Sequence, residues 1–453
     1  MNVTSHRISI LAVLFVGGTL CAAAGRSDAA DSPEYIPPVP DAAASTVLPA
    51  AEGQQTPAVQ EEPPVASGDE CPCADYCGMP LCSPPGRFWL RADYLMWWTS
   101  GMTLPPLVTT GTTANPTSTV LFGNDIVNDG GRSGFRTTAG MWLNCRHTWD
   151  VEFDYLELGG QSANFSEFST GNPILTRPFF NVQTNSGDAE KVAFPATGDQ
   201  PQVSGSISVV AKDYFQSAGV SMSYNLCSCG SCCDSCDSCS APCANCCMPM
   251  LNCCRTDLVV GLRYYNLSDS VLIHETPQST LPALAMFDIN DNFSADNKFY
   301  GSELGLRTKL HRGRWSLEIL TKIAMGNTHE TVNINGQTIT TTADGTVTQN
   351  AGVFATSTNS GTFQRDTFTV IPQLGLELGY QLSCHWRAYL GYNLLYWGSV
   401  WRSGDQIDLQ LDPRNIPSNP AFSPNTALPF PQFPAQASAF WAQGINVGLE
   451  RRF

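Results

Sequence analysis

The residues of this sequence with the clearest chemical potential are its cysteines, 18 in a chain of 453 residues. Eleven of them lie between positions 227 and 254, where four C-x-x-C spacings occur. Thiols at this spacing form disulfides, bind zinc or exchange electrons. The spacings overlap among Ser, Asp and Gly without a thioredoxin-like βαβ pattern, so we expect a disulfide-stapled lobe, with a metal site as the alternative. The candidate disulfide or metal residues are Cys71, Cys73, Cys77, Cys82, Cys227, Cys229, Cys232, Cys233, Cys236, Cys239, Cys243, Cys246, Cys247, Cys253 and Cys254.

Removal of Cys21 with a signal peptide would leave 17 cysteines, since Cys145 and Cys384 complete the set. Because 17 is odd, at least one thiol is free, modified or bonded to another chain, and a disulfide-linked neighbour is one predicted partner. His147, His311 and His385 fall in or beside predicted short turns and could assist a metal site; the alternative is that they are polar rim residues. No cofactor is predicted beyond a metal on the cysteine cluster.

Charged side chains form a second set, because they alternate with apolar residues along the chain. Such charges would line the lumen of a membrane barrel, where rings of charge set ion preference. The alternative is that they pair with one another and fill the lumen. The pore-lining candidates are Arg91, Asp93, Asp150, Glu152, Asp154, Arg263, Glu303, Arg307, Lys309, Glu318, Lys322, Glu377 and Arg387.

The elements that must carry these charges read as β-strands, because hydrophobicity from Arg87 onward has a period of two. Tyr214–Leu226 is the clearest case, with an apolar face opposite a face of small polar residues. An apolar face toward lipid and a polar face toward a lumen is typical of transmembrane barrels. Ten segments share the pattern: Arg87–Trp98, Gly134–Asn144, Trp149–Leu158, Tyr214–Leu226, Asp257–Leu267, Lys298–Leu310, Trp315–Gly326, Asp366–Leu382, His385–Trp397 and Ala439–Phe453.

Connections between these segments alternate in length, which predicts short periplasmic turns, long outer loops and both termini in the periplasm. The predicted fold is all-β, an antiparallel transmembrane β-barrel of about ten strands, with twelve as the alternative. We expect long outer loops at 99–133, 159–206, 268–297, 327–365 and 398–438. Within 329–349, Asn335-Gly336 predicts a hairpin that rises above the membrane.

The N-terminal part predicts export and a flexible connection. Met1–Ala24 resembles a signal peptide, and Cys21 raises lipidation as an alternative to ordinary cleavage. Residues 25–70 are rich in Pro and Ala and predict a disordered linker, either a tether or a plain spacer. Residues 71–86 form a Cys-rich periplasmic segment, and 87–453 form the barrel, with a periplasmic Cys-rich insert at 227–254.

Composition excludes other classes of protein. The net charge is −16 and only 14% of residues are charged, so clustered cations for nucleic-acid binding are lacking. No G-x-S-x-G or H-E-x-x-H motif occurs, and the predicted outer loops contain only His274 and His329. We therefore predict that the protein is not an enzyme.

Several segments resemble a family of outer-membrane β-barrel porins that is expanded in planctomycetes and related to Legionella outer membrane proteins. They are Arg87–Trp98, Gly261–Ser270, Asn359–Asp366, Gly379–Arg387, Gly404–Asp408 and Phe440–Asn446. The resemblance implies an outer-membrane barrel and brings no catalytic residue. The aromatic C-terminus, Phe453, resembles the signal recognised by the barrel assembly machinery.

These patterns favour a porin-like passive channel for small solutes or ions, located in the outer membrane and surrounded by its lipid. The alternative is a structural envelope protein, in which the barrel is an anchor and the cysteine-rich periplasmic lobe crosslinks or stiffens the envelope.

Overall fold

The computed structural model describes residues 86–111, 119–144, 147–196, 201–230, 253–279 and 285–453. The chain divides into two compact units, 1–74 and 75–453, and all described residues belong to the second. The predicted signal peptide, linker and first cysteine segment therefore lie outside the described residues, apart from Gly86.

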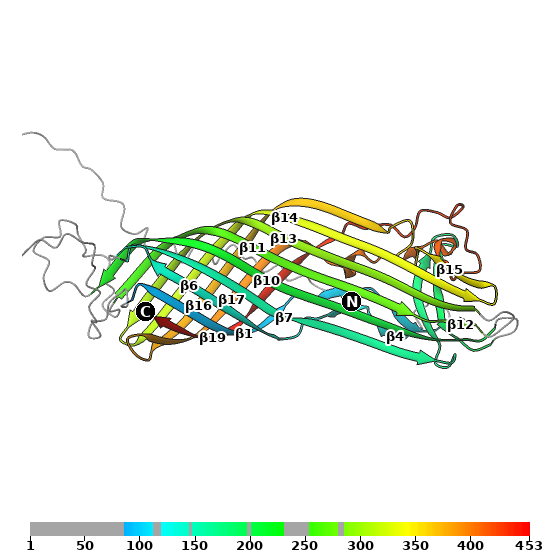
Figure 1. Cartoon of the computed structure of the whole chain (residues 1–453), viewed down its shortest axis with the longest axis horizontal. Helices are drawn as coiled ribbons and strands as arrows, with labels where there is room; N and C mark the ends of the chain where they lie inside the picture. The colour runs from blue at the N-terminus through cyan, green and yellow to red at the C-terminus, as the bar shows by residue number, and fades with distance from the viewer. Residues whose placement is uncertain (1–85, 112–118, 145–146, 197–200, 231–252, 280–284) are drawn as a thin grey trace, which may run out of the picture. The chain divides into compact units, whose positions relative to one another are not determined.

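Within the described residues, ten antiparallel strands close into a ring (Figure 1). They are β1 (Phe88–Thr99), β6 (Arg132–Trp142), β7 (Trp149–Ser169), β10 (Val203–Gly230), β11 (Cys253–Glu275), β13 (Ala285–Arg312), β14 (Trp315–Thr342), β16 (Gly361–Gln381), β17 (Trp386–Trp401) and β19 (Ala437–Arg452). Each pairs with the next, and β19 returns to β1 with Gly448 opposite Asp93. The predicted all-β barrel is confirmed. Two short strands, β12 (Gln278–Ser279) and β15 (Gly345–Gln349), join the same sheet without entering the ring.

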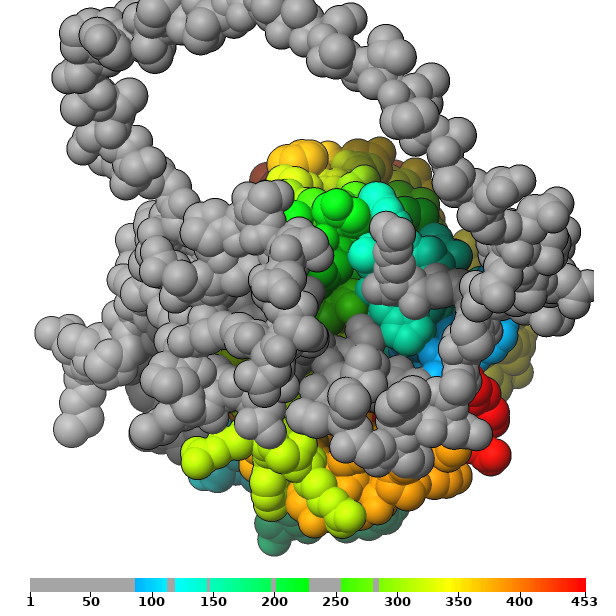
Figure 2. All heavy atoms as spheres, turned by 90° about the vertical axis from the view of Figure 1, so that its left-hand side faces the viewer, coloured from blue at the N-terminus to red at the C-terminus, as the bar shows by residue number. Residues whose placement is uncertain are grey.

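The two ends of the barrel differ. The turn end carries the short connections 143–148, 313–314 and 382–385. Viewed from that side, the β13–β14 turn, the β16–β17 turn and the C-terminus follow one another along the rim (Figure 2). The loop end carries the long connections 100–131, 170–202 and 402–436.

Alternation explains why these segments form a barrel wall. Along β1, exposed and buried side chains follow one another from Leu90 to Thr99. Leu90 is 50% exposed on the outer surface, whereas Arg91 is 8% exposed inside. Leu262 on β11 and Leu304 on β13 are also exposed. The outer surface near the turn end is therefore an apolar belt suited to lipid.

The strands are longer than predicted, and most of the expected loops at 268–297 and 327–365 is wall, whereas most of 159–206 is not. β10, β13 and β14 have 28 residues each, against the roughly 9–11 that cross a bilayer. The predicted hairpin within 329–349 is present and is formed by β14 and β15, but its turn lies at 343–344 rather than at Asn335-Gly336, since β14 continues to Thr342. Gly336 serves a close approach instead: a Cβ atom there would lie 1.8 Å from the carbonyl oxygen of Ala355.

The long connections fold back over the loop end and form short elements. These are β2 (Met102–Leu104), β3 (Val108–Thr110), β4 (Thr119–Phe122), β5 (Asp125–Val127), β8 (Leu175–Asn181), β9 (Ser186–Ala193), β18 (Gln410–Leu411) and the 3₁₀ turns η3 (Gly404–Gln406) and η4 (Pro413–Asn415). Their apolar side chains pack against inward-facing residues of the wall, including Ile273, Phe293 and Ile334. We call this buried cluster the cork.

None of the helical segments among the described residues is long and apolar enough to span a membrane.

Candidate functional site: a charged lumen beneath an aromatic layer

All thirteen predicted pore-lining residues lie inside the barrel. Asp154 and Lys309 are half-buried. The others are buried: Arg91, Asp93, Asp150, Glu152, Arg263, Glu303, Arg307, Glu318, Lys322, Glu377 and Arg387. We call this set, with the partners named below, the lumen ion cluster. Alternation in the sequence predicts the inner face for all of them. The structure brings these residues, from positions 91 to 387, together in one lumen.

One part of the lumen ion cluster centres on Arg263 of β11. Its guanidinium group donates to Asp154 at 2.5 Å and to Glu303 at 2.8 Å. The ammonium group of Lys322 lies 2.9 Å from Glu303. Two cations and two carboxylates from four strands thus neutralise one another, which offsets the large cost of burying each charge alone.

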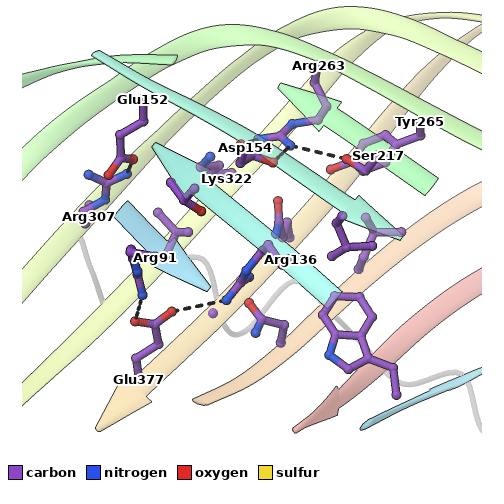
Figure 3. Close-up of a pocket in the computed structure, with 18 of the residues that line it drawn as sticks. Arg91, Arg136, Glu152, Asp154, Ser217, Arg263, Tyr265, Arg307, Lys322 and Glu377 are labelled. Carbon is purple, nitrogen blue, oxygen red and sulfur yellow. Dashed lines mark hydrogen bonds and ion pairs between the residues drawn. The ribbon is translucent and has the colours of Figure 1, made fainter. Parts of the chain in front are cut away.

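A second part involves Glu377 of β16, which accepts from both Arg91 and Arg136 (Figure 3). Arg136 also donates to Asp93 at 3.1 Å. The Nε of Arg91 donates to the Tyr389 hydroxyl at 3.2 Å. Guanidinium forks that each serve two acceptors fix the geometry of the cluster as well as its charge.

A third part lies nearer the turn end. Arg307 pairs with Glu152 and lies 3.7 Å from Glu318, whose carboxylate also lies 3.4 Å from the ammonium group of Lys309. Arg387 lies 3.2 Å from Glu450 on the closing strand β19.

Sequence reasoning missed five members of the lumen ion cluster: Arg136, Arg255, Asp257, Glu450 and Arg452. The signal was present, because Glu450 and Arg452 alternate with outward Val447 and Leu449.

An apolar layer closes the lumen beyond the charges. Its side chains come from every ring strand except β6, and all are 0–6% exposed. They are Leu95, Trp97, Leu156, Leu158, Phe215, Tyr265, Leu267, Phe299, Ala324, Ile371, Leu395, Trp397, Val400, Phe440 and Ala442. Ring centroids lie 5.2 Å apart for Phe215 and Phe440, and 6.2 Å apart for Phe299 and Trp397. We call these residues the aromatic layer.

The space between the lumen ion cluster and the aromatic layer is small. A cavity of about 60 Å³ is lined by residues of both, among them Arg91, Arg263, Trp97 and Phe215. This volume holds a few water molecules. A hydrated solute does not fit.

A second ionic group separates the aromatic layer from the cork. Arg132 lies 2.9 Å from Asp213, and Arg402 lies 2.6 Å from Asp269. The backbone N–H of Ser403 also donates to Asp269 at 2.6 Å. These bonds tie the connection that follows β17 to the wall.

The cork is held by buried Asp291 of β13. Its carboxylate accepts from the backbone N–H groups of Val353, Phe354 and Ala355, and from Arg177 at 2.6 Å. Glu275 lies 3.7 Å from Arg177. Burial raises the pKa of Glu275 to about 7; Arg177 opposes this shift, and Glu190 and Asp291 add to it.

Only the two ends of the cysteine cluster at 227–254 lie within the described residues. Cys227 and Cys229 belong to the end of β10, while Cys253 and Cys254 begin β11, so the connection between the strands spans 231–252 rather than 227–254. The remaining candidate cysteines lie outside the described residues. In the described part of the chain, no group of three or more His, Cys, Asp or Glu side chains could hold a metal. His147 stacks on Trp142, with ring centroids 4.8 Å apart.

A closed antiparallel ring with an apolar outer belt and a charged interior defines the class as a transmembrane β-barrel of the outer-membrane type. The sequence model of the family described as Putative beta barrel porin-7 (BBP7) matches residues 89–453. The chain belongs to that family, which confirms the predicted porin-type barrel.

Solved structures with a similar trace are outer-membrane barrels. The protease OmpT from Escherichia coli has 6% identity and a TM-score of 0.35, and the match covers 81% of this chain and 97% of that one. A Pseudomonas aeruginosa FadL homologue has 10% identity and a TM-score of 0.21, with 81% and 90% covered. The P. putida toluene transporter TodX has 8% identity and a TM-score of 0.19, with 82% and 91% covered. Scores this low carry no argument about activity. No curated protein matches the sequence.

Proposed function

We propose that this protein is a sealed outer-membrane barrel that anchors the rest of the chain to the outer membrane. The observation that carries the proposal is the aromatic layer, whose side chains are at most 6% exposed. A passive channel needs a continuous path of water, and side chains that line such a path are solvated. Buried indole and phenyl rings at the level of Trp97 and Trp397 support a closed lumen.

The charges below the layer support the same conclusion. Arg263 and Lys322 both donate hydrogen bonds to Glu303. These paired groups present little free charge to a passing ion. A ten-stranded barrel is also narrow, and its interior can be filled by side chains.

The anchored part would be the linker and the cysteine-rich segments, which lie outside the described residues. In this account they sit in the periplasm and form disulfides within the chain or to neighbours. Non-reducing gels of native envelopes test the disulfides to neighbours: ladders that collapse on reduction support such crosslinks, and monomer alone contradicts them.

A channel that opens when the cork moves is the second candidate. The family description as a porin favours it, and so does the charged wall that would then line the lumen. The thirteen predicted residues would set its ion preference.

We expect no catalytic activity. His274 lies 3.1 Å from Asp288, and His329 lies 3.0 Å from Asp366. Both pairs stand on the outer surface, and their other side-chain partners are Asn290 and Asn327, which are amides without nucleophilic character.

Swelling of proteoliposomes in isotonic solutions of small sugars tests the proposal. Proteoliposomes that contain the refolded mature protein are expected to swell no faster than protein-free vesicles. Swelling that depends on solute size would support the channel and overturn the sealed barrel.

A further inference from the structure

A second cavity lies at the turn end of the lumen and has a volume of about 30 Å³. Its polar lining is dominated by cations. Among the described residues, four cations, Arg255, Lys309, Arg387 and Arg452, line it beside the imidazole of His311 and the hydroxyl of Ser316, against the single carboxylate of Glu318.

The carboxylates near this cavity are shared. Arg387 and Arg452 both pair with Glu450, which also lies 3.9 Å from Arg91. Glu318 is shared by Lys309 and Arg307. With Asp257 paired to Arg255, Arg387 and Arg452 share one carboxylate, and the described cavity wall itself carries four cations and one carboxylate.

A donor at the cavity lacks a hydrogen-bond partner within the described part of the chain. The Nη1 atom of Arg452 is buried there without an acceptor, and the Nδ1 atom of His311 and the Oε2 atom of Glu318 are also buried without a hydrogen bond. A buried donor without a partner loses its hydration with no compensation, so each one calls for an explanation. An anion in the cavity supplies an acceptor for Arg452 and a negative charge among four cations.

We propose that this cavity, which we call the basic pocket, binds a small inorganic anion, chloride being the one whose size it fits. A volume of about 30 Å³ admits about two water-sized spheres. A single chloride ion is slightly larger than a water molecule, whereas a tetrahedral oxyanion needs the walls to move.

The site goes beyond the proposed anchor role, since it concerns how the turn end of the lumen is stabilised. Its failure is distinguishable from that of the sealed barrel, because it is measured by stability rather than by flux.

The test uses the refolded mature chain, with its unfolding temperature followed by gel mobility after heating. Chloride is compared with gluconate at constant ionic strength. Binding to the folded state alone is expected to raise the unfolding temperature by about 2–4 °C in chloride. Arg452→Gln is expected to remove this difference, while Arg312→Gln, an exposed arginine at the same end, keeps it. Equal unfolding temperatures in both anions, or a chloride effect that survives Arg452→Gln, would overturn the proposal.

Bromide makes the proposal testable even if Arg452→Gln does not refold. Anomalous diffraction from wild-type crystals grown in bromide is expected to show a peak between Arg452 and His311. An empty pocket, or bromide bound only elsewhere, contradicts it.

Discussion

The turn end and the loop end of this barrel are built from the same strands and have opposite interiors. On β11, Leu262 points outward and is 62% exposed, while neighbouring Arg263 points inward and is 6% exposed. Eleven residues later, Ile273 points inward and is fully buried, and His274 stands half-exposed outside. The alternation continues without a break, but the chemistry of the two faces is exchanged.

The exchange indicates which part of the wall is surrounded by lipid and which part is surrounded by water. Where lipid surrounds the barrel, apolar residues face outward and charges gather inside. Where water surrounds it, the ordinary rule of soluble proteins returns and the apolar side chains fill the interior. The barrel is therefore a membrane protein at one end and a water-exposed, cork-filled domain at the other, with the aromatic layer between them.

The largest expected effect comes from the ionic end. Arg263→Ala removes a partner of both Asp154 and Glu303 in a buried site, and Glu303 keeps only Lys322 among the described residues. We expect a loss of about 3–5 kcal/mol in the free energy of unfolding, measured by urea titration of the refolded barrel. Arg312→Ala, which removes an exposed charge, should cost less than about 0.5 kcal/mol. Equal costs would mean that the lumen ion cluster is solvated.

At the apolar end, Phe293→Ala removes a fully buried ring from the cork. It should cost about 3–5 kcal/mol, with loss of protection of the loop end against protease. Phe368→Ala makes the same change at a side chain that is 71% exposed on the outer wall. We expect Phe368→Ala to cost less than about 1 kcal/mol. A cost as large as that of Phe293→Ala would argue against the assigned faces.

Acidity should act on the loop end through Glu275, which faces Arg177, Glu190 and Asp291. Its folded pKa of about 7 lies above the ordinary value of 4.5. The contribution of Glu275 to the stability of the closed cork is therefore fully present below about pH 4.5, and up to about 3 kcal/mol of it is lost as pH rises through 7. Protease resistance of the loop end should be higher at pH 5 than at pH 8.

Glu275→Gln should flatten this pH dependence, whereas Glu167→Gln, at an exposed position on β7, should leave it unchanged. A pH profile that is the same in wild type and Glu275→Gln would assign the dependence to another group.

Most of the wall could be predicted from the sequence, because alternation of apolar and charged residues is a local property. It placed Arg263 and Glu303 inside before their contacts were known. Alternation does not indicate, however, at which residue a strand passes from lipid into water. Phe293 and Ile334 therefore fell in expected loops, and Asn335-Gly336 was interpreted as a turn.

The cork itself could not be predicted. Its contacts join Asp291 to the backbone of residues 353–355 and Arg402 to Asp269, over separations of 62 to 133 residues along the chain. No short-range pattern encodes such pairs.

The smallest expected effect sharpens the boundary between the two ends. Leu262→Arg places a cation in the lipid-facing belt and should cost about 2 kcal/mol or more in bilayers. His274→Arg, on the same face of β11 beyond the belt, should be nearly neutral. Similar costs for both, measured by unfolding from liposomes, would contradict the exchange of solvents along the strand.

The central claim is that the aromatic layer seals the lumen, and single-channel conductance of the refolded mature protein in a planar bilayer tests it most directly. With and without reductant, the account predicts a folded, heat-modifiable protein that inserts and stays silent. Discrete current steps of reproducible size would contradict it and establish a conducting pore.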